Sequence, residues 1–342
     1  MEEVNKLLMQ RALELAALGR GTVSPNPMVG CVIFKNGKII GEGWHREYGQ
    51  AHAEVNAINS VKDKAELEGA ELYVTLEPCA HFGKTPPCAD LIVQFPFKKV
   101  FIANIDPFKS VNGMGIEKLL SHGIQVETGI LEKEGKELNK RFFTSIEKER
   151  PYIILKWAET SDGFIAREDF TSKWISGEFS RLLVHKWRSE EDAILVGTST
   201  AKYDDPGLNV REWQGRNPLR VVVDKVLKLE RTLKIFDNNQ STLILNEIKN
   251  DKSLLNEWIR IDFKNTVNEI LKVLNEKKIQ SLIVEGGAKI LQSFIQSNFW
   301  DEARIFKSKN LFNQGIKAPE IGGIVENRQC IGDDELTWLV NR

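Results

Sequence analysis

One histidine and two cysteines form the sharpest chemical pattern in this sequence. His52 begins the run His-Ala-Glu, and the pair Pro78-Cys79 is followed nine residues after the cysteine by Cys88. One imidazole and two thiolates are a soft ligand set that suits tetrahedral zinc. Three protein ligands leave a fourth position for water, and zinc lowers the pKa of such a water to about 7. We therefore expect a catalytic zinc ion held by His52, Cys79 and Cys88.

Glu54 follows His52 by two residues and is not required as a fourth ligand. Its expected role is catalytic, carrying a proton from water to a leaving amine. A His-x-Glu run followed by Pro-Cys and a second cysteine is the signature of zinc deaminases. Residues two apart on an ideal helix point roughly 200° away from each other, so His52 and Glu54 can converge only where the helix opens. Singly, each residue could be a core thiol or a helix-start histidine; together they favour the metal site.

The spacing of the two cysteines departs from the generic deaminase pattern. Eight residues separate Cys79 from Cys88, whereas the generic signature has two. The inserted loop carries His81, Lys84 and Thr85, and two prolines restrict its backbone. A stiff loop with a cation and a hydroxyl could bind a phosphate group. The alternative is an ordinary exposed turn whose lysine is merely solvated.

The elements that would position these residues alternate between helix and strand. Apolar residues at helical spacing predict a helix over residues 4–18, and Asn36-Gly37 between two apolar runs predicts a β-hairpin over 29–43. A second helix is expected to begin near His52 and to run through Ile58. Further strands are expected at 71–76, 100–105 and 124–127, with a helix at 115–120. This pattern predicts one sheet with helices on both faces.

A charged stretch that ends in proline, Glu147–Pro151, predicts a boundary between a domain over 1–147 and another over 151–342. The alternation then restarts, with strands at 152–157, 193–196, 219–223, 242–245 and 281–284 and helices at 178–187, 267–274 and up to Phe299. The second half has no G-x-G-x-x-G run, which argues against a Rossmann domain. The turn Glu285–Ala288 lies between a strand and a helix and could bring backbone N–H groups to a phosphate. Tight packing would explain its two glycines equally well.

Longer runs make the resemblance to a known family specific. In the first half Pro25–Val32, His52–Val55, Thr75–Cys79 and Gly83–Asp90 resemble the bifunctional deaminase/reductases of riboflavin biosynthesis. The long cysteine spacing separates that family from cytidine and tRNA-adenosine deaminases. The family's reductase domain is similar to Leu155–Ala158, Ser161–Gly163, Ser172–Ser176, Ala193–Gly197, Asp204–Pro206 and Val210–Arg211. Two departures from the family stand out: Ser161 occurs where leucine is usual, and Ile305–Lys309 occurs where an apolar strand with Ala-Pro is usual.

The resemblance implies a mixed α/β fold, with a cytidine-deaminase-like three-layer α/β/α domain followed by a dihydrofolate-reductase-like α/β domain. It implies zinc-dependent hydrolytic deamination of 2,5-diamino-6-(5-phosphoribosylamino)pyrimidin-4-one, and then NADPH-dependent reduction of the ribosyl group to ribityl. In the deaminase domain it implies substrate contacts at Asn26, His45, His81, Lys84 and Thr85. In the reductase domain it implies NADPH near Ala158, Trp174, Thr200, Asp204 and Gly287. It implies the sugar-phosphate substrate near Lys156, Ser172, Arg188, Leu208, Arg211 and Glu285.

Composition bears on the alternatives. Of 342 residues, 42% are hydrophobic and 28% charged, which is typical of globular domains. Residues 1–150 carry 19 basic and 20 acidic residues, and the remainder carries 28 of each, so neither half is the basic surface that nucleic acid requires. This argues against a nucleic-acid-editing deaminase; a nucleoside zinc deaminase with an accessory domain is the other alternative. A purely structural zinc module would have no use for Glu54.

The chain also carries signals about its surroundings. Its first ten residues include early acids, which argues against a signal or transit peptide. No apolar run approaches the ~18–20 residues that a membrane span needs. Four cysteines do not form a disulfide framework, and in a reducing compartment paired cysteines indicate metal binding or catalysis. We expect a cytoplasmic homo-oligomer that acts on a small molecule, without a membrane or nucleic-acid partner.

Overall fold

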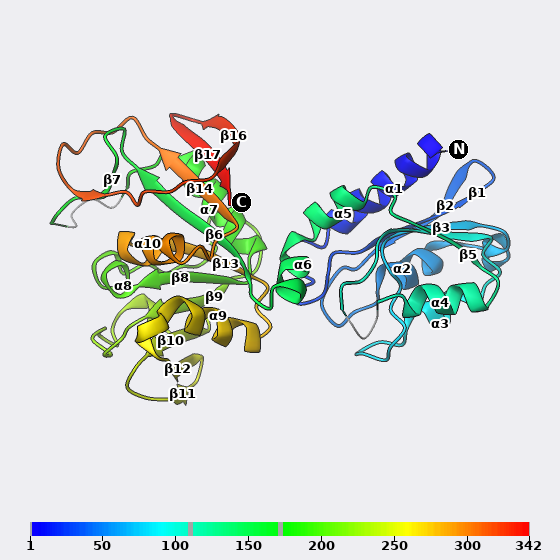
Figure 1. Ribbon diagram of the computed structural model, residues 1–342, viewed down its shortest axis with the longest axis horizontal. Helices are drawn as coiled ribbons and strands as arrows, with labels where there is room; N and C mark the ends of the chain where they lie inside the picture. Colours follow the sequence, from blue (N-terminus) through cyan, green and yellow to red (C-terminus); the bar gives the residue numbers. More distant parts are fainter. Residues whose placement is uncertain (1, 109–111, 170–173, 342) are drawn as a thin grey trace. The chain divides into compact units, whose positions relative to one another are not determined.

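Two compact units make up the chain, Met1–Glu149 and Arg150–Arg342 (Figure 1). The computed structural model describes residues 2–108, 112–169 and 174–341. Each unit has its own sheet and its own hydrophobic core, so each is described by itself.

The first unit is built on a five-stranded sheet with the strand order β2-β1-β3-β4-β5. β1 pairs antiparallel with β2 and β3, whereas β3, β4 and β5 are parallel. The strands are β1 (Gly30–Lys35), β2 (Lys38–Trp44), β3 (Glu71–Leu76), β4 (Lys99–Asn104) and β5 (Gln125–Thr128). The helices are α1 (Glu2–Ala17), α2 (Ala53–Ser60), α3 (Cys88–Ile92), α4 (Met114–Ser121), α5 (Glu132–Leu138) and α6 (Lys140–Glu147).

Alternation along the strands puts a separate core on each face of this sheet. On β1, Val32 packs with residues of α1, while Cys31 and Ile33 pack with residues of α2, α3 and α4. Successive side chains of a strand point to opposite faces, so one strand serves both cores. The predicted three-layer α/β/α arrangement is therefore confirmed, as is the hairpin at Asn36-Gly37.

The second unit contains a ten-stranded sheet with the order β11-β12-β10-β9-β8-β13-β6-β14-β17-β16. β13 lies between β6 and β8 and runs parallel to both. The strands of this unit are β6 (Tyr152–Glu159), β7 (Phe164–Ala166), β8 (Ala193–Gly197), β9 (Leu219–Val223), β10 (Thr242–Asn246), β11 (Asp251–Ser253), β12 (Asn256–Arg260), β13 (Ser281–Gly286), β14 (Glu302–Lys307), β15 (Ile316–Lys317), β16 (Ile324–Ile331) and β17 (Asp334–Val340). β7 and β15 form a separate two-stranded sheet.

Among the described residues of this unit, four α-helices cover the ten-stranded sheet: α7 (Glu178–Glu190), α8 (Thr198–Asp204), α9 (Thr266–Glu276) and α10 (Ala288–Gln296). Residues of α9 and α10 join the largest core cluster on one face, which includes Leu243 and Leu282. Residues of α7 and α8 pack with strand residues of the opposite face, such as Ile154 and Val222. The second unit is therefore α/β, as the sequence predicts, and its helices lie on both faces of the sheet.

Several short or exposed elements escape the sequence analysis. β16 has little burial along its length, so it offers no apolar alternation to detect. The segment Ile305–Lys309, whose side chains depart from the family's usual apolar strand, begins within β14. Backbone pairing with β6 and β17 forms this strand despite its charged side chains.

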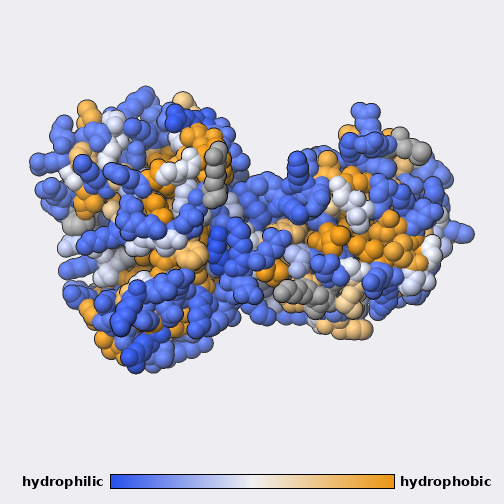
Figure 2. Space-filling model, viewed as in Figure 1, coloured by the Kyte–Doolittle hydropathy of each residue, from blue (hydrophilic) through white to orange (hydrophobic). Residues whose placement is uncertain are grey.

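The drawn face of the second unit carries both hydrophilic and hydrophobic residues (Figure 2). On the face drawn in Figure 2, hydrophilic and hydrophobic residues are interspersed over the second unit. Within residues 2–108, 112–169 and 174–341, none of the helices combines the length and the apolar character of a membrane span.

Candidate active sites

In the first unit the three expected zinc ligands converge. The Nδ1 atom of His52 lies 3.6 Å from the Sγ atom of Cys79 and 3.3 Å from that of Cys88. The three ligand atoms lie within 4.8 Å of one another. Ligands placed ~2.0–2.3 Å from a tetrahedral zinc ion are themselves roughly 3.5–3.8 Å apart. The donor set and its spacing therefore fit zinc.

Each ligand stands at or near the end of a secondary-structure element. Cys79 lies three residues beyond β3, His52 is the N-cap residue of α2, and Cys88 is the first residue of α3. The Cys88 N–H donates to the Cys79 sulfur at 3.3 Å, and the Ala89 N–H donates to the Cys79 carbonyl at 3.1 Å. These two bonds hold the second thiolate against the first.

His52 and Glu54 can converge because His52 is the N-cap residue of α2 and does not have a helical backbone conformation. Its backbone is extended (φ −72°, ψ 168°), so the angular separation of an ideal helix does not apply between it and Glu54. Glu54 lies in the first turn of α2 and is 3% exposed. Burial, followed by the charge of Cys79, raises the pKa of Glu54 to about 7. The carboxyl group therefore lies close enough to Cys79 and His52 to interact with their charges.

A close approach of α2 to β2 fixes the depth of this helix. A Cβ atom on Gly43 would lie 2.3 Å from the backbone nitrogen of Ala57 and 2.6 Å from the carbonyl oxygen of Ala53. Only glycine allows the helix to lie this close to the strand. The residue at this strand position therefore helps to set where Glu54 stands.

Asn26 and His45 form a hydrogen-bonded pair next to the zinc ligands. The His45 Nδ1 atom lies 3.1 Å from the carbonyl oxygen of Ala51, so Nδ1 carries the proton and Nε2 accepts from the Asn26 amide nitrogen at 3.1 Å. The His45 ring also meets the His52 ring edge-on, with centroids 5.2 Å apart. Burial lowers the pKa of His45 and favours its neutral form. This bonding fixes how the Asn26 amide is turned.

The three candidate residues of the inserted loop lie in different settings. The Thr85 hydroxyl oxygen is 3.3 Å from the Nε2 atom of His52, on the side of the ring away from the sulfurs. The Lys84 ammonium lies 3.9 Å from the centre of the Tyr48 ring, a cation–π contact. His81 is exposed. Of the three, Thr85 alone contacts a zinc ligand.

Glu77 is a site residue that the sequence analysis misses. Its side chain is 3% exposed, and its carboxylate accepts four backbone N–H bonds, two from residues between β4 and α4 and two from the first turn of α4. The donors are Asp106 (3.3 Å), Gly113 (3.1 Å), Gly115 (2.9 Å) and Ile116 (3.4 Å). Glu77, which lies two residues before Cys79, thus anchors the start of α4 and the residues that precede it. Its place in the run Glu-Pro-Cys is the signal that could have indicated it.

In the second unit a cavity of about 1050 Å³ opens at the carboxyl ends of β6, β8 and β13. Ten of the eleven residues expected to bind cofactor or substrate line it, and Ser172 lies outside the described residues. These ten are Lys156, Ala158, Trp174, Arg188, Thr200, Asp204, Leu208, Arg211, Glu285 and Gly287. Neither Ser161 nor Lys307 is among the described residues that line this cavity. The structure therefore brings the reductase candidates to one place.

A buried charge cluster forms one wall of the cavity. The Arg188 guanidinium binds the Glu285 carboxylate through two bonds, of 2.9 and 2.7 Å, and the Lys156 ammonium lies 3.9 Å from Glu285. Burial alone would raise the pKa of Glu285, but the charges of Arg188 and Lys156 outweigh it and lower the pKa to about 2. Burial, together with Arg188, lowers the pKa of Lys156 against the effect of Glu285.

His185 is a second residue that the motifs do not indicate. It lies on α7, lines the cavity, and has its Nε2 atom 3.7 Å from the Glu212 carboxylate. Burial and then the charges of Arg188 and Arg211 lower the pKa of His185 to about 4. The ring is therefore neutral near neutral pH, and a lone helical histidine gives no sequence signal of this setting.

Comparison with known proteins decides the family. The family model of the cytidine and deoxycytidylate deaminase zinc-binding region matches residues 2–104, and that of the RibD C-terminal domain matches residues 151–308. The riboflavin biosynthesis protein RibD of Aquifex aeolicus is 40% identical over 328 residues, covering 94% of this chain and 92% of that protein. The chain belongs to the RibD family.

Other relatives are similar to this chain over most of its length. RibD of Bacillus amyloliquefaciens is 40% identical, covering 92% of this chain and 86% of that protein. The crystal structure of a deaminase/reductase from Thermotoga maritima superposes with a TM-score of 0.92 at 38% identity, covering 100% of this chain and 99% of that one. The expected fold class is thus confirmed.

Membership also confirms the expected chemistry in outline. RibD proteins are bifunctional enzymes of riboflavin biosynthesis, a deaminase and a reductase in one chain. Their cofactors are zinc and NADPH, and the His52, Cys79 and Cys88 group is the candidate zinc site.

Proposed function

We propose that this enzyme deaminates 2,5-diamino-6-(5-phosphoribosylamino)pyrimidin-4-one and then reduces the ribosyl group of the product to a ribityl chain. The Thermotoga maritima relative is named a diaminohydroxyphosphoribosylaminopyrimidine deaminase and 5-amino-6-(5-phosphoribosylamino)uracil reductase. The observation that carries the proposal is one chain holding both a buried glutamate beside a His/Cys/Cys set and a large cavity lined by the reductase candidates. No nucleic acid enters this reaction.

In the deaminase step Glu54 is the catalytic residue. A zinc ion held by His52, Cys79 and Cys88 would lower the pKa of a bound water and so would supply a nucleophile near neutral pH. The Glu54 carboxylate accepts a proton from the water and passes it to the amine nitrogen. A carbon–oxygen bond forms, the carbon–nitrogen bond breaks, and ammonia leaves. Asn26 and His45, with His81, Lys84 and Thr85 of the inserted loop, bind the substrate or hold the site around it.

In the reductase step the chain binds and orients two small molecules. NADPH would supply a hydride to the C1 carbon of the ribosyl group; the bond between C1 and the ring oxygen breaks, and a proton goes to the released oxygen, which gives the open ribityl chain. Ala158, Trp174, Thr200, Asp204 and Gly287 bind the cofactor. Lys156, Ser172, Arg188, Leu208, Arg211 and Glu285 bind the substrate, with an arginine gripping its phosphate through paired N–H donors.

We also propose a cytoplasmic location and a homo-oligomeric state. Two of the proposed zinc ligands are cysteine thiols, and unpaired thiols are typical of a reducing compartment such as the cytoplasm. β16 forms one edge of the ten-stranded sheet and is largely exposed, and an open edge favours pairing with a second copy. Light scattering on the purified enzyme that gives the mass of a single chain would contradict the oligomer.

Replacing Glu54 with glutamine tests the proposed function. Glu54→Gln should slow ammonia release by ~10²–10⁴-fold, because a positioned proton carrier is lost. Zinc content by elemental analysis should stay near one per chain, and NADPH oxidation with pre-deaminated substrate should be unchanged. The exposed Glu68→Gln serves as the matched control. A wild-type enzyme that releases no ammonia from the diamino substrate would refute the assignment.

A further inference from the structure

One irregular segment carries three of the residues expected to bind ligands in the reductase cavity. Asp204 ends α8, and Leu208 and Arg211 follow in a stretch without helix or strand. Asp205 (φ +40°) and Leu208 (φ +50°) have left-handed backbone conformations, which are costly for residues other than glycine. This segment, residues 204–211, can keep its shape only if the surrounding structure holds it.

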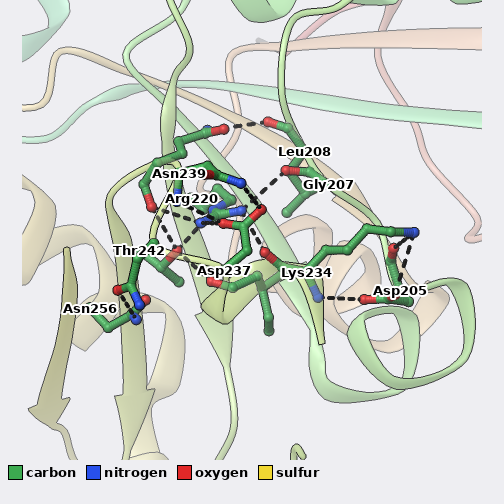
Figure 3. Close-up of polar contacts among 12 residues, drawn as sticks. Asp205, Gly207, Leu208, Arg220, Lys234, Asp237, Asn239, Thr242 and Asn256 are labelled. Carbon is green, nitrogen blue, oxygen red and sulfur yellow. Dashed lines mark hydrogen bonds and ion pairs between the residues drawn. The ribbon is translucent and has the colours of Figure 1, made fainter. Parts of the chain in front are cut away.

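Arg220 on β9 lies at the centre of the contacts that hold it (Figure 3). This arginine is 1% exposed and is among the largest fully buried side chains of the unit. Its guanidinium donates to the following acceptors: the Thr242 hydroxyl (2.8 Å), the Lys234 carbonyl (2.8 Å), the Gly207 carbonyl (3.5 Å), the Asp237 carboxylate (2.9 Å) and the Gln240 carbonyl (2.7 Å). A guanidinium has five N–H donors in a fixed fork, and here five bonds use them.

Residues of the same network hold the segment at two further points. The Gln240 side-chain amide donates to the Leu208 carbonyl at 3.4 Å. The Lys234 N–H donates to the Asp205 carboxylate at 2.7 Å, and the Lys234 ammonium donates to the Asp205 carbonyl at 3.2 Å. Arg220 in turn fixes the carbonyls of Lys234 and Gln240. It therefore joins the segment directly at Gly207 and indirectly at both sides of it.

We infer that Arg220 is a positioning residue of the reductase, which sets the 204–211 segment in the conformation that binds NADPH and substrate. The inference rests on the proposed function, because it assigns ligand contacts to Asp204, Leu208 and Arg211. Arg220 acts through the carbonyls of the segment. Lysine cannot replace it, because an ammonium offers three donors from a single point and lacks the planar fork.

The test compares Arg220→Lys with two other variants of the intact enzyme. Gln240→Met removes the side-chain bonds to the Leu208 carbonyl and to the Pro218 carbonyl without touching the buried charge. Leu243→Ala is the matched control for stability, because Leu243 is buried in the neighbouring strand β10 and packs in the core on the opposite face. Ammonia release in the same chain reports that the first unit remains intact in every variant.

Two measurements report whether the 204–211 segment keeps its conformation. Hydrogen exchange in the ligand-free enzyme follows the Val210 amide, which donates to the Asn217 side chain at 2.8 Å. KM for NADPH and for the deaminated substrate follows binding. Arg220→Lys should speed exchange in residues 205–211 and raise both KM values by at least about five-fold, the equivalent of one lost hydrogen bond. Gln240→Met should shift both in the same direction, and Leu243→Ala should leave KM at its wild-type value.

The outcomes separate the inference from the proposed function. Wild-type exchange and KM in Arg220→Lys would overturn the inference, as would an equal rise of KM in Leu243→Ala. If Arg220→Lys does not fold, Gln240→Met decides, and its wild-type behaviour overturns the inference. If the wild-type enzyme never oxidises NADPH, the proposed function fails, while the exchange comparison still tests whether Arg220 holds the segment.

Discussion

Where the second unit begins can be tested by one residue, Arg150. Its guanidinium binds the Asp301 carboxylate through two bonds, of 2.6 and 2.7 Å, and the two side chains are 11% and 10% exposed. Asp301 also accepts the Ile153 N–H at 2.8 Å, so this carboxylate ties the start of β6 to the residue before β14. A fragment begun at Pro151, as the sequence boundary suggests, lacks the arginine.

The loss can be estimated from this geometry. Breaking a buried ion pair by removing one partner costs about 3–5 kcal/mol. Without Arg150, Asp301 still accepts the Ile153 N–H, and its side chain is already 10% exposed to water, which reduces the expected cost to roughly 2–3 kcal/mol. For a unit of this size each kcal/mol lowers Tm by about 2–4 °C, so the shorter fragment should melt roughly 5–10 °C below the longer one.

The assay compares fragments 150–342 and 151–342, with Arg150→Ala in the longer fragment as the matched control. In thermal unfolding, the Tm of the Arg150→Ala variant should be close to the Tm of the shorter fragment. The longer fragment should oxidise NADPH with the deaminated substrate and release no ammonia from the diamino substrate, since His52, Cys79 and Cys88 lie in the other unit. Equal Tm values for all three proteins would refute the reasoning. A stable longer fragment that never oxidises NADPH would show that the reductase depends on residues before Arg150.

Three further predictions follow from the two sites. Thr85→Val should weaken zinc binding by ~10–100-fold, because the hydroxyl orients the His52 ring, and Thr85→Ser should retain it; a raised KM at unchanged zinc affinity would instead make Thr85 a substrate contact. Lys84→Ala should raise KM for deamination more than it lowers kcat if the lysine binds phosphate, whereas kinetics like those of the exposed Lys38→Ala would contradict that role. The stabilisation from ionised Glu285 is complete above its usual pKa of 4.5 and is lost as the pH falls towards about 2. Denaturant titrations should therefore show about 3 kcal/mol of unfolding free energy lost over this range, and Glu285→Gln should not show that loss.

The zinc site could be read from the sequence because its chemistry is local. His52 and Glu54 are two residues apart, and Cys79 and Cys88 are nine residues apart. The type and order of the ligands can therefore be recognised without knowledge of the fold. The sequence could not give the N-cap conformation of His52, which depends on where α2 begins. It also could not give the four backbone bonds to Glu77, because their donors lie 29 to 39 residues later in the chain.

The second site could not be derived from spacing at all. Resemblance named its residues, but pattern reasoning gave only a turn with two glycines. Arg220 shows the reason most clearly: a single arginine in an apolar strand carries no motif, and its partners become neighbours only when β9 pairs with β10 in the register that sets Arg220 opposite Thr242. Pairing register depends on the whole sheet, so a local sequence window does not contain it.

Strand order explains why the reductase charges meet where they do. Lys156, Arg188 and Glu285 are spread over 129 positions of the chain, yet β13 lies between β6 and β8 in the sheet. In a sheet whose neighbouring strands are parallel, their carboxyl ends reach the same edge, and ligands bind in the crevice outside that edge. Glu285 near the end of the middle strand therefore stands between the cation on β6 and the cation from α7, which precedes β8. Had β13 been added at an outer edge of the sheet, Glu285 would lie away from its two cations, and the depressed pKa shows how much of its ionisation in the buried site depends on them.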